Sequence, residues 1–151
     1  MARPFRLQSL LEYKRQQEEQ QTLLLASLDA QYRAVRAALE ALRREEDEQL
    51  RRIAELAQGG RLDAEQYRTA ISYLGRLEGS IGEQSDALAA AEQRVLESRD
   101  ALLGILKEKR SLERLHERRD AETDLADGRR EARQMDEITS ARHVRRAGEE
   151  G

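Results

Sequence analysis

The sequence contains no cysteine, and only one of its 151 residues is a proline. Without cysteine, neither a disulfide framework nor a thiolate metal site can form. The single proline, Pro4, stands where a first helical turn tolerates it, so every later residue is free to be helical. We find no apolar run long enough to span a bilayer and no secretory signal, which predicts a cytoplasmic protein.

Aromatic residues are also scarce, at 3% of the sequence, whereas charged residues make up 38%. Such a composition is shared by disordered chains and by coiled coils, and the spacing of the apolar residues must decide between them. Both ends of the chain are basic and the middle is acidic. Because no stacking aromatics lie among the basic residues, we expect no nucleic-acid binding.

In the first part of the chain, apolar residues recur in alternating steps of four and three from Leu7 to Leu56. These steps average 3.5 residues, which is the repeat of a left-handed coiled coil rather than of a lone amphipathic helix. The apolar members of this series are Leu7, Leu11, Leu25, Leu28, Tyr32, Val35, Leu39, Leu42, Ile53 and Leu56. Its polar members are Lys14, Glu18, Gln21, Glu46 and Gln49.

The pattern stops at Gly59-Gly60, a pair that indicates the C-terminus of a helix. Asp63 and Gln66 then follow in the arrangement of a capping box, which predicts that a second helix begins here. The second series again has steps of three and four. Its members are Tyr67, Ala70, Leu74, Leu77, Ile81, Gln84, Leu88, Ala91, Val95, Ser98, Leu102, Ile105, Lys109 and Leu112.

The sequence therefore predicts an all-α fold in which two long helices form an antiparallel coiled-coil hairpin. We expect a helix over about 5–58, a turn at 59–63 and a helix over about 64–146, all within a single coiled-coil domain over 1–151. A short connection makes the two helices antiparallel neighbours, so a residue should face the one whose number is about 121 minus its own. After about residue 116 the second helix has no partner left in the first, and we expect an overhanging C-terminal helical segment.

The sequence shows no features of an active site. It lacks a glycine-rich phosphate loop, a Ser/His/Asp constellation and any metal-ligand spacing, and its two histidines, His116 and His143, are far apart. The abundant Asp and Glu residues suit a solvated coiled-coil face. We therefore expect a protein that is not an enzyme, holds no cofactor or metal, and binds other proteins.

The two series together form the line of contact between the helices, here called the seam. Two places carry apolar side chains that lie outside the seam. Phe5 and Leu10 lie among basic residues at the start, where they either clamp the end of the hairpin or enter a partner's socket. Near the turn, Ile71 and Tyr73 flank the seam and are expected to be partly exposed. Three glycines in the same region indicate either close helix packing or a soft segment at which a partner docks. They are Gly75, Gly79 and Gly82.

Several segments, in order along nearly the whole chain, resemble the FliJ family of flagellar export proteins. They are Pro4–Leu11, Leu62-Asp63-Ala64 before Tyr67, Tyr73-Leu74 with Leu77, Lys109–Leu115 and Arg130–Ile138. The resemblance implies an antiparallel two-helix coiled coil similar to the γ stalk of rotary ATPases. It also implies association with the flagellar export ATPase (FliI), with the membrane export gate (FlhA) and with export chaperones. We accordingly expect a cytoplasmic protein that is peripheral at the inner face of the cell membrane through these partners.

The resemblance also assigns candidate binding residues to the two ends of the hairpin. The ATPase-binding set is Phe5, Leu7, Leu10, Leu11, Met135, Asp136 and Ile138. The gate-binding set is Tyr67, Ile71, Tyr73, Leu74 and Leu77. One alternative is the equivalent stalk protein of a virulence type III injectisome. Others are a general adaptor that self-associates through its seam into a parallel or higher oligomer, and a helical arm that binds nucleic acid.

Overall fold

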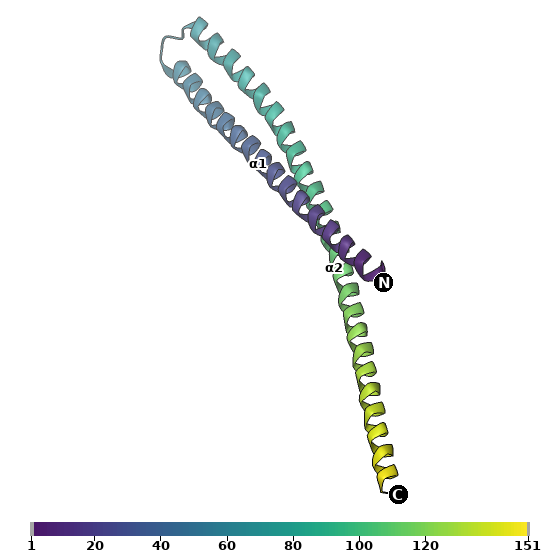
Figure 1. Cartoon of the computed structure of the whole chain (residues 1–151). Coiled ribbons are helices and arrows are strands. Elements are labelled where there is room, and N and C mark those ends of the chain that lie inside the picture. Colours follow the sequence, from purple (N-terminus) through teal and green to yellow (C-terminus); the bar gives the residue numbers. More distant parts are fainter. Residues whose placement is uncertain (1, 151) are drawn as a thin grey trace. The chain divides into compact units, whose positions relative to one another are not determined.

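The computed structural model describes the backbone of residues 2–150 and the side chains of residues 6–150. It consists of two helices, α1 (Ala2–Gln58) and α2 (Ala64–Glu149), joined by a short connection (Figure 1). No strand occurs between residues 2 and 150. The two long helices pack against each other in an antiparallel hairpin, so the predicted fold class is confirmed.

The connection between the helices is built by local chemistry. Gly60 adopts a positive φ of 69°, a conformation that costs glycine little, and the Arg61 amide donates to the Gly59 carbonyl at 2.8 Å. The Asp63 carboxylate then accepts a hydrogen bond from the Glu65 amide at 3.0 Å. This bond satisfies one of the amides that the first turn of α2 leaves without a helical partner. The chain therefore reverses at the glycine pair, and Asp63 caps the start of α2.

The two helices pair within two compact units, which are described separately. The hairpin unit comprises residues 17–104, and the terminal unit comprises the residues up to Gln16 together with those from Ile105 onwards. In the hairpin unit, every position of the two predicted seam series is buried or half-buried. The most completely buried leucine is Leu39, with 3% of its surface exposed. A 3.5-residue repeat thus does bury one stripe of each helix here.

Polar residues in this seam bond across it. The Gln21 amide nitrogen donates to the Ser98 hydroxyl at 2.9 Å and to the Ser98 carbonyl at 3.2 Å, and the Gln49 amide donates to the Ala70 carbonyl at 3.2 Å. Each partner lies two residues from the position expected to face it. Among the described residues, no buried side-chain nitrogen or oxygen lacks a partner. The polar layers therefore fix the register without leaving an unsatisfied group.

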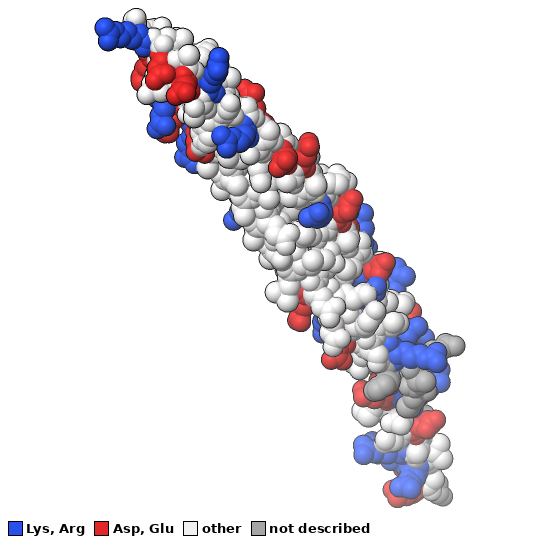
Figure 2. All heavy atoms as spheres, turned by 90° about the horizontal axis from the view of Figure 1, so that it is seen from above, with Lys and Arg blue, Asp and Glu red and all other residues white. Residues whose placement is uncertain are grey.

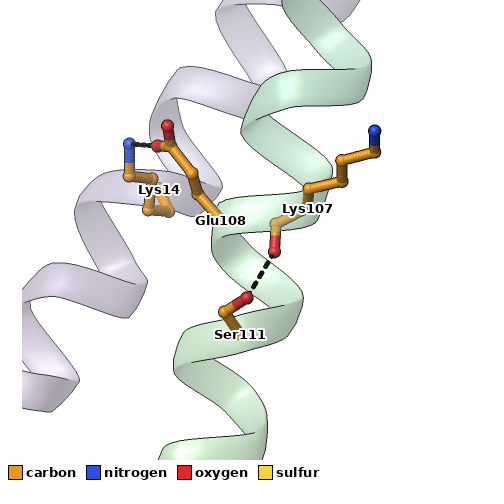
Figure 3. A network of polar contacts seen from close by, with 4 residues as sticks. All are labelled: Lys14, Lys107, Glu108 and Ser111. Carbon is orange, nitrogen blue, oxygen red and sulfur yellow. Dashed lines mark hydrogen bonds and ion pairs between the residues drawn. The ribbon is translucent and has the colours of Figure 1, made fainter.

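In the terminal unit, the start of α1 packs on α2. Leu7 and Leu11 are 4% and 5% exposed, and half-buried side chains continue along α2 as far as Arg119. Lys14 forms an ion pair with Glu108 across the two helices, as Figure 3 shows. The Ser111 hydroxyl instead bonds back within α2, to the Lys107 carbonyl at 3.1 Å (Figure 3). From residue 120 to residue 150 every side chain is exposed, so the segment of α2 beyond Arg119 has no cover from α1.

The three glycines near the turn do not mediate close packing. A Cβ added at Gly75, Gly79 or Gly82 would meet nothing within 4 Å, and all three positions are exposed. The interpretation as a close-approach site is therefore wrong. Each glycine lowers helix stability by about 1 kcal/mol relative to alanine. A soft segment near the turn stays a prediction.

The contribution of the seam to the free energy of unfolding can be tested. Leu39→Ala should lower the free energy of unfolding by about 2 to 3 kcal/mol, in the lower part of the range for buried leucines because its seam neighbours are only half-buried. Leu23→Ala is the matched control on the same helix, since Leu23 is 72% exposed, and it should change the free energy by about 0.5 kcal/mol or less. Urea unfolding followed by circular dichroism measures both. Equal effects of the two variants would contradict the seam.

Candidate partner-binding surfaces

The described residues offer surfaces rather than a chemical centre. Between residues 2 and 150, no group of three or more His, Cys, Asp or Glu side chains could hold a metal ion. Within the same range, neither helix contains a stretch that is both long and apolar enough to cross a membrane. The structure has exposed apolar side chains on both helices, and such side chains are typical of protein–protein interfaces.

The residues predicted to bind the ATPase divide into two groups. Leu7 and Leu11 are buried against α2, whereas Leu10, Met135 and Ile138 are exposed, and Met135 most of all at 65%. The side chain of Phe5 lies outside the described residues. Asp136 is exposed beside Met135. Leu10 lies where α1 and α2 pair, and Met135, Asp136 and Ile138 lie beyond that pairing, so the structure does not gather the set at one place.

The segment of α2 over residues 120–150, here called the unpaired segment, has an apolar face of its own. Leu125, Gly128, Ala132 and Met135 follow one another in steps of three and four, which places them on one side of the helix. Leu125 and Val144 are exposed apolar residues that the predicted site did not include. Leu125 could have been found from its spacing to Met135. An isolated helix with such a face is marginal in water and is stabilised by a partner.

The residues predicted to bind the export gate also divide. Leu77 is buried, and Tyr67 and Leu74 are half-buried members of the seam. Ile71 is 42% exposed, and Leu50 of α1 is exposed to a similar degree. Leu50 directly follows Gln49, and Ile71 directly follows Ala70. The Gln49 side chain donates a hydrogen bond to the Ala70 carbonyl, so these two positions lie opposite each other. Leu50 and Ile71 therefore lie on the same edge of the hairpin unit and form a small apolar patch. Sequence reasoning missed Leu50.

Tyr73 is half-buried on the other edge, where it bridges the two helices. Its hydroxyl donates a hydrogen bond to the Glu45 carboxylate. This bond raises the pKa of Tyr73 above its ordinary value of 10.0, with smaller contributions from desolvation and from the Glu45 charge. Beside the pair lies an open groove of about 780 Å³ that has Leu56 and Ala70 in its wall together with the charged Arg52 and Arg76. Tyr73 is thus held in place at the rim of a groove that both helices form.

The arrangement defines a class of protein: a helical hairpin with an unpaired helical segment and exposed apolar groups suited to binding other proteins. The family model described as Flagellar FliJ protein matches residues 3–148 of this chain. The chain therefore belongs to the FliJ family, and it is a flagellar protein related to export. Neither the curated proteins nor the solved structures contain a match.

Membership of this family fixes the function in outline. The FliJ family is a non-catalytic component of the flagellar export machinery, so the chain belongs to flagellum biogenesis and protein export. Because the match is to a flagellar family, it favours the flagellar assignment over the injectisome alternative. The family match extends over the unpaired segment as well as over the paired helices.

The Tyr73–Glu45 bond can be tested by titration. Glu45→Ala removes both the acceptor oxygens and the charge, so it should lower the pKa of Tyr73, whereas Glu48→Ala, at an exposed neighbouring position, should leave it unchanged. A raised folded-state pKa means that this contribution to stability is complete below the ordinary value of 10.0 and is lost as the pH rises through the folded value. Near-ultraviolet absorbance measures tyrosinate, and Tyr73→Phe identifies its component. Identical titrations of wild type and Glu45→Ala would contradict the bond.

Proposed function

We propose that this chain is a stalk-like coiled coil that binds the flagellar export ATPase (FliI) ring and couples it to the membrane export gate (FlhA) and to export chaperones. In this proposal the protein is cytoplasmic and peripheral at the inner face of the cell membrane through its partners. The observation that carries it is the unpaired segment in a chain of the FliJ family: residues 120–150 are helical almost to the end, and every side chain among them is exposed.

The unpaired segment needs a partner for a physical reason. Its large apolar side chains, among them Leu125, Met135 and Ile138, are each more than half exposed. Burying one such side chain contributes about 1.5 to 3 kcal/mol, and a helix without tertiary contacts has little other stabilisation. A ring of ATPase subunits around this segment would cover it from several sides at once. The proposed ATPase contacts are therefore Met135, Asp136 and Ile138, together with Leu10.

The buried members of the ATPase set have a supporting role in this proposal. Leu7 and Leu11 pack the start of α1 onto α2, and the Lys14–Glu108 ion pair bridges the same two helices. These contacts hold the start of α1 on the paired part of α2, in the same unit as the unpaired segment. Phe5 and Leu10, if they contact the ring, would do so from this anchored stretch of α1.

At the turn, the proposed gate contacts are the exposed Ile71 and the bridging Tyr73. Tyr67, Leu74 and Leu77 belong to the seam and would position these contacts from beneath. Because α1 and α2 each run through both units, a contact at either surface bears on the same two helices. The chain would couple ring and gate by stabilising the assembled hexamer or by transmitting rotation.

ATP hydrolysis by the flagellar export ATPase of the same organism tests the first contact. The wild-type chain should stimulate hydrolysis and shift the ATPase towards its hexamer on sizing. Met135→Glu combined with Ile138→Glu places charge on the unpaired segment and should weaken binding by about tenfold or more, since each lost apolar contact is worth over 1 kcal/mol. Leu103→Glu is the control, because Leu103 is similarly exposed but lies in the hairpin unit.

Two results would contradict this assignment. Absence of any stimulation or complex with the wild-type chain would remove the stalk proposal and leave a coiled-coil export protein with another partner. Equal loss of stimulation with Leu103→Glu would show that the contact does not depend on the unpaired segment.

The gate contact is tested separately. Ile71→Asp should weaken binding of the chain to the cytoplasmic part of the export gate by about tenfold, because a charge replaces an apolar contact. ATPase stimulation should stay unchanged, since Ile71 lies outside the terminal unit. Ala89→Asp, at an exposed position elsewhere on α2, is the control. Calorimetry measures the affinity of each variant for the export gate. Normal binding by Ile71→Asp would show that the gate contacts another surface.

A further inference from the structure

Helix α1 carries a second coiled-coil series that lies beside the seam, on the side of the helix turned to solvent. The steps are again four and three. Three further residues, each directly preceding a member of the series, widen it. Its members, here called the uncharged face, are Gln20, Leu24, Ser27, Gln31, Ala34, Ala38 and Ala41, flanked by Leu23, Ala30 and Ala37. None of these residues is charged, and all are exposed. The whole face lies within the hairpin unit.

The charges of this stretch of α1 are confined to its other side. Arg33 pairs with Asp29 at 3.0 Å and Arg36 with Glu40 at 3.3 Å, each one helical turn apart. In a chain with 38% charged residues, an uncharged strip about 22 residues long is not what a purely solvated helix requires. Figure 2 shows an area of this kind on one face of the molecule, where Lys, Arg, Asp and Glu are sparse. The strip is therefore suited to contact with another helix.

The uncharged face adjoins the established seam. Leu24, Gln31 and Ala38 directly precede the seam residues Leu25, Tyr32 and Leu39. A further helix laid along the face would therefore continue the left-handed packing of the hairpin, with the same 3.5-residue repeat on both sides of α1. The many alanines allow a close approach of such a helix.

We propose that two copies of the chain associate antiparallel through the uncharged face, with Gln31 of each copy near the two-fold axis. The large side chains, Leu23 and Leu24, lie at one end of the face, and the alanines from Ala34 to Ala41 lie at the other. In antiparallel pairing the leucines of each copy pack over the alanines of the other. Parallel pairing would set leucine on leucine and leave a gap between alanines. Alternation of large and small residues across a contact is what close packing requires.

The charges that flank the face fit the same alignment. The Gln21–Ser98 and Gln49–Ala70 bonds set the level of α2 beside α1. In that register Arg94 lies level with Leu25, and Glu83 lies level with Arg36. These two levels are almost equally far before and after Gln31. The two-fold axis thus brings Arg94 of one copy close to the level of Glu83 of the other, and this pair of opposite charges favours the antiparallel orientation.

The size of the face sets the expected strength. A strip of about 22 residues is roughly 33 Å long, and a hairpin is about two helices, or roughly 20 Å, wide. The contact would bury about 1,300 Å² in total, which is near the lower limit for a stable interface. The dimer should therefore form only at about 10 µM or above and dissociate on dilution. This association uses a surface other than the seam and does not depend on the proposed function.

Sedimentation of the full-length chain over a concentration series tests the proposal. Wild type should pass from monomer to dimer, and Ala38→Glu should remain monomeric because it places a charge against Leu24 of the other copy. Ala89→Glu, an exposed alanine of α2 away from the uncharged face, should dimerise like wild type. Circular dichroism confirms that each variant keeps its helices. A wild-type chain that is monomeric at all concentrations, or a dimer indifferent to Ala38→Glu, would overturn the proposal.

A mixture of two variants tests the orientation. Leu24→Lys alone should also weaken the dimer, but mixed with Ala38→Glu it should restore association, because antiparallel pairing sets the lysine of one chain against the glutamate of the other. Since the chain has no cysteine, Gln31→Cys places a unique thiol near the axis, and a short thiol cross-linker should join two copies there but not in Ala89→Cys. No restoration in the mixture together with no cross-link at Gln31→Cys would rule out the antiparallel arrangement.

Discussion

The structure depends on one constraint: two helices in contact can each bury only one narrow stripe. In the hairpin unit that stripe is the 3.5-residue series, and its burial of Leu39, Leu77 and Val95 is the main source of tertiary stability. All other faces of both helices meet solvent. The exposed groups described above therefore lie on the outer faces of the two helices.

The polar residues within the seam decide which exposed groups become neighbours. The bonds of Gln21 to Ser98 and of Gln49 to Ala70 hold the two helices in one register. That register places the Tyr73 hydroxyl on Glu45 and sets Leu50 on the same edge as Ile71. A slip of the helices would leave the seam amides unsatisfied, at a cost of about 1 to 3 kcal/mol each. Polar contacts in the seam therefore set the geometry of the surfaces near the turn.

The exposed faces differ in what they offer a partner. The unpaired segment after Arg119 presents scattered large apolar groups and mixed charge, which suits enclosure by a larger assembly. The uncharged face of α1 is smoother, because it is rich in alanine, and it suits a second hairpin packed along it. The match to a flagellar export family extends over the first of these surfaces. The second is a property of this chain's own residues.

The sequence alone determined the two helices, the turn and the seam, because these follow from local periodicity and from the chemistry of Gly60 and Asp63. It also determined the overhang, since the second helix is longer than the first. Only the tertiary structure decided that Leu7 and Leu11 are covered while Leu10 and Met135 are exposed, and that pairing continues to Arg119. It likewise showed that the glycines after Tyr73 face open space. Exposure and register depend on how two distant stretches of chain meet, and a pattern within either stretch does not contain that information.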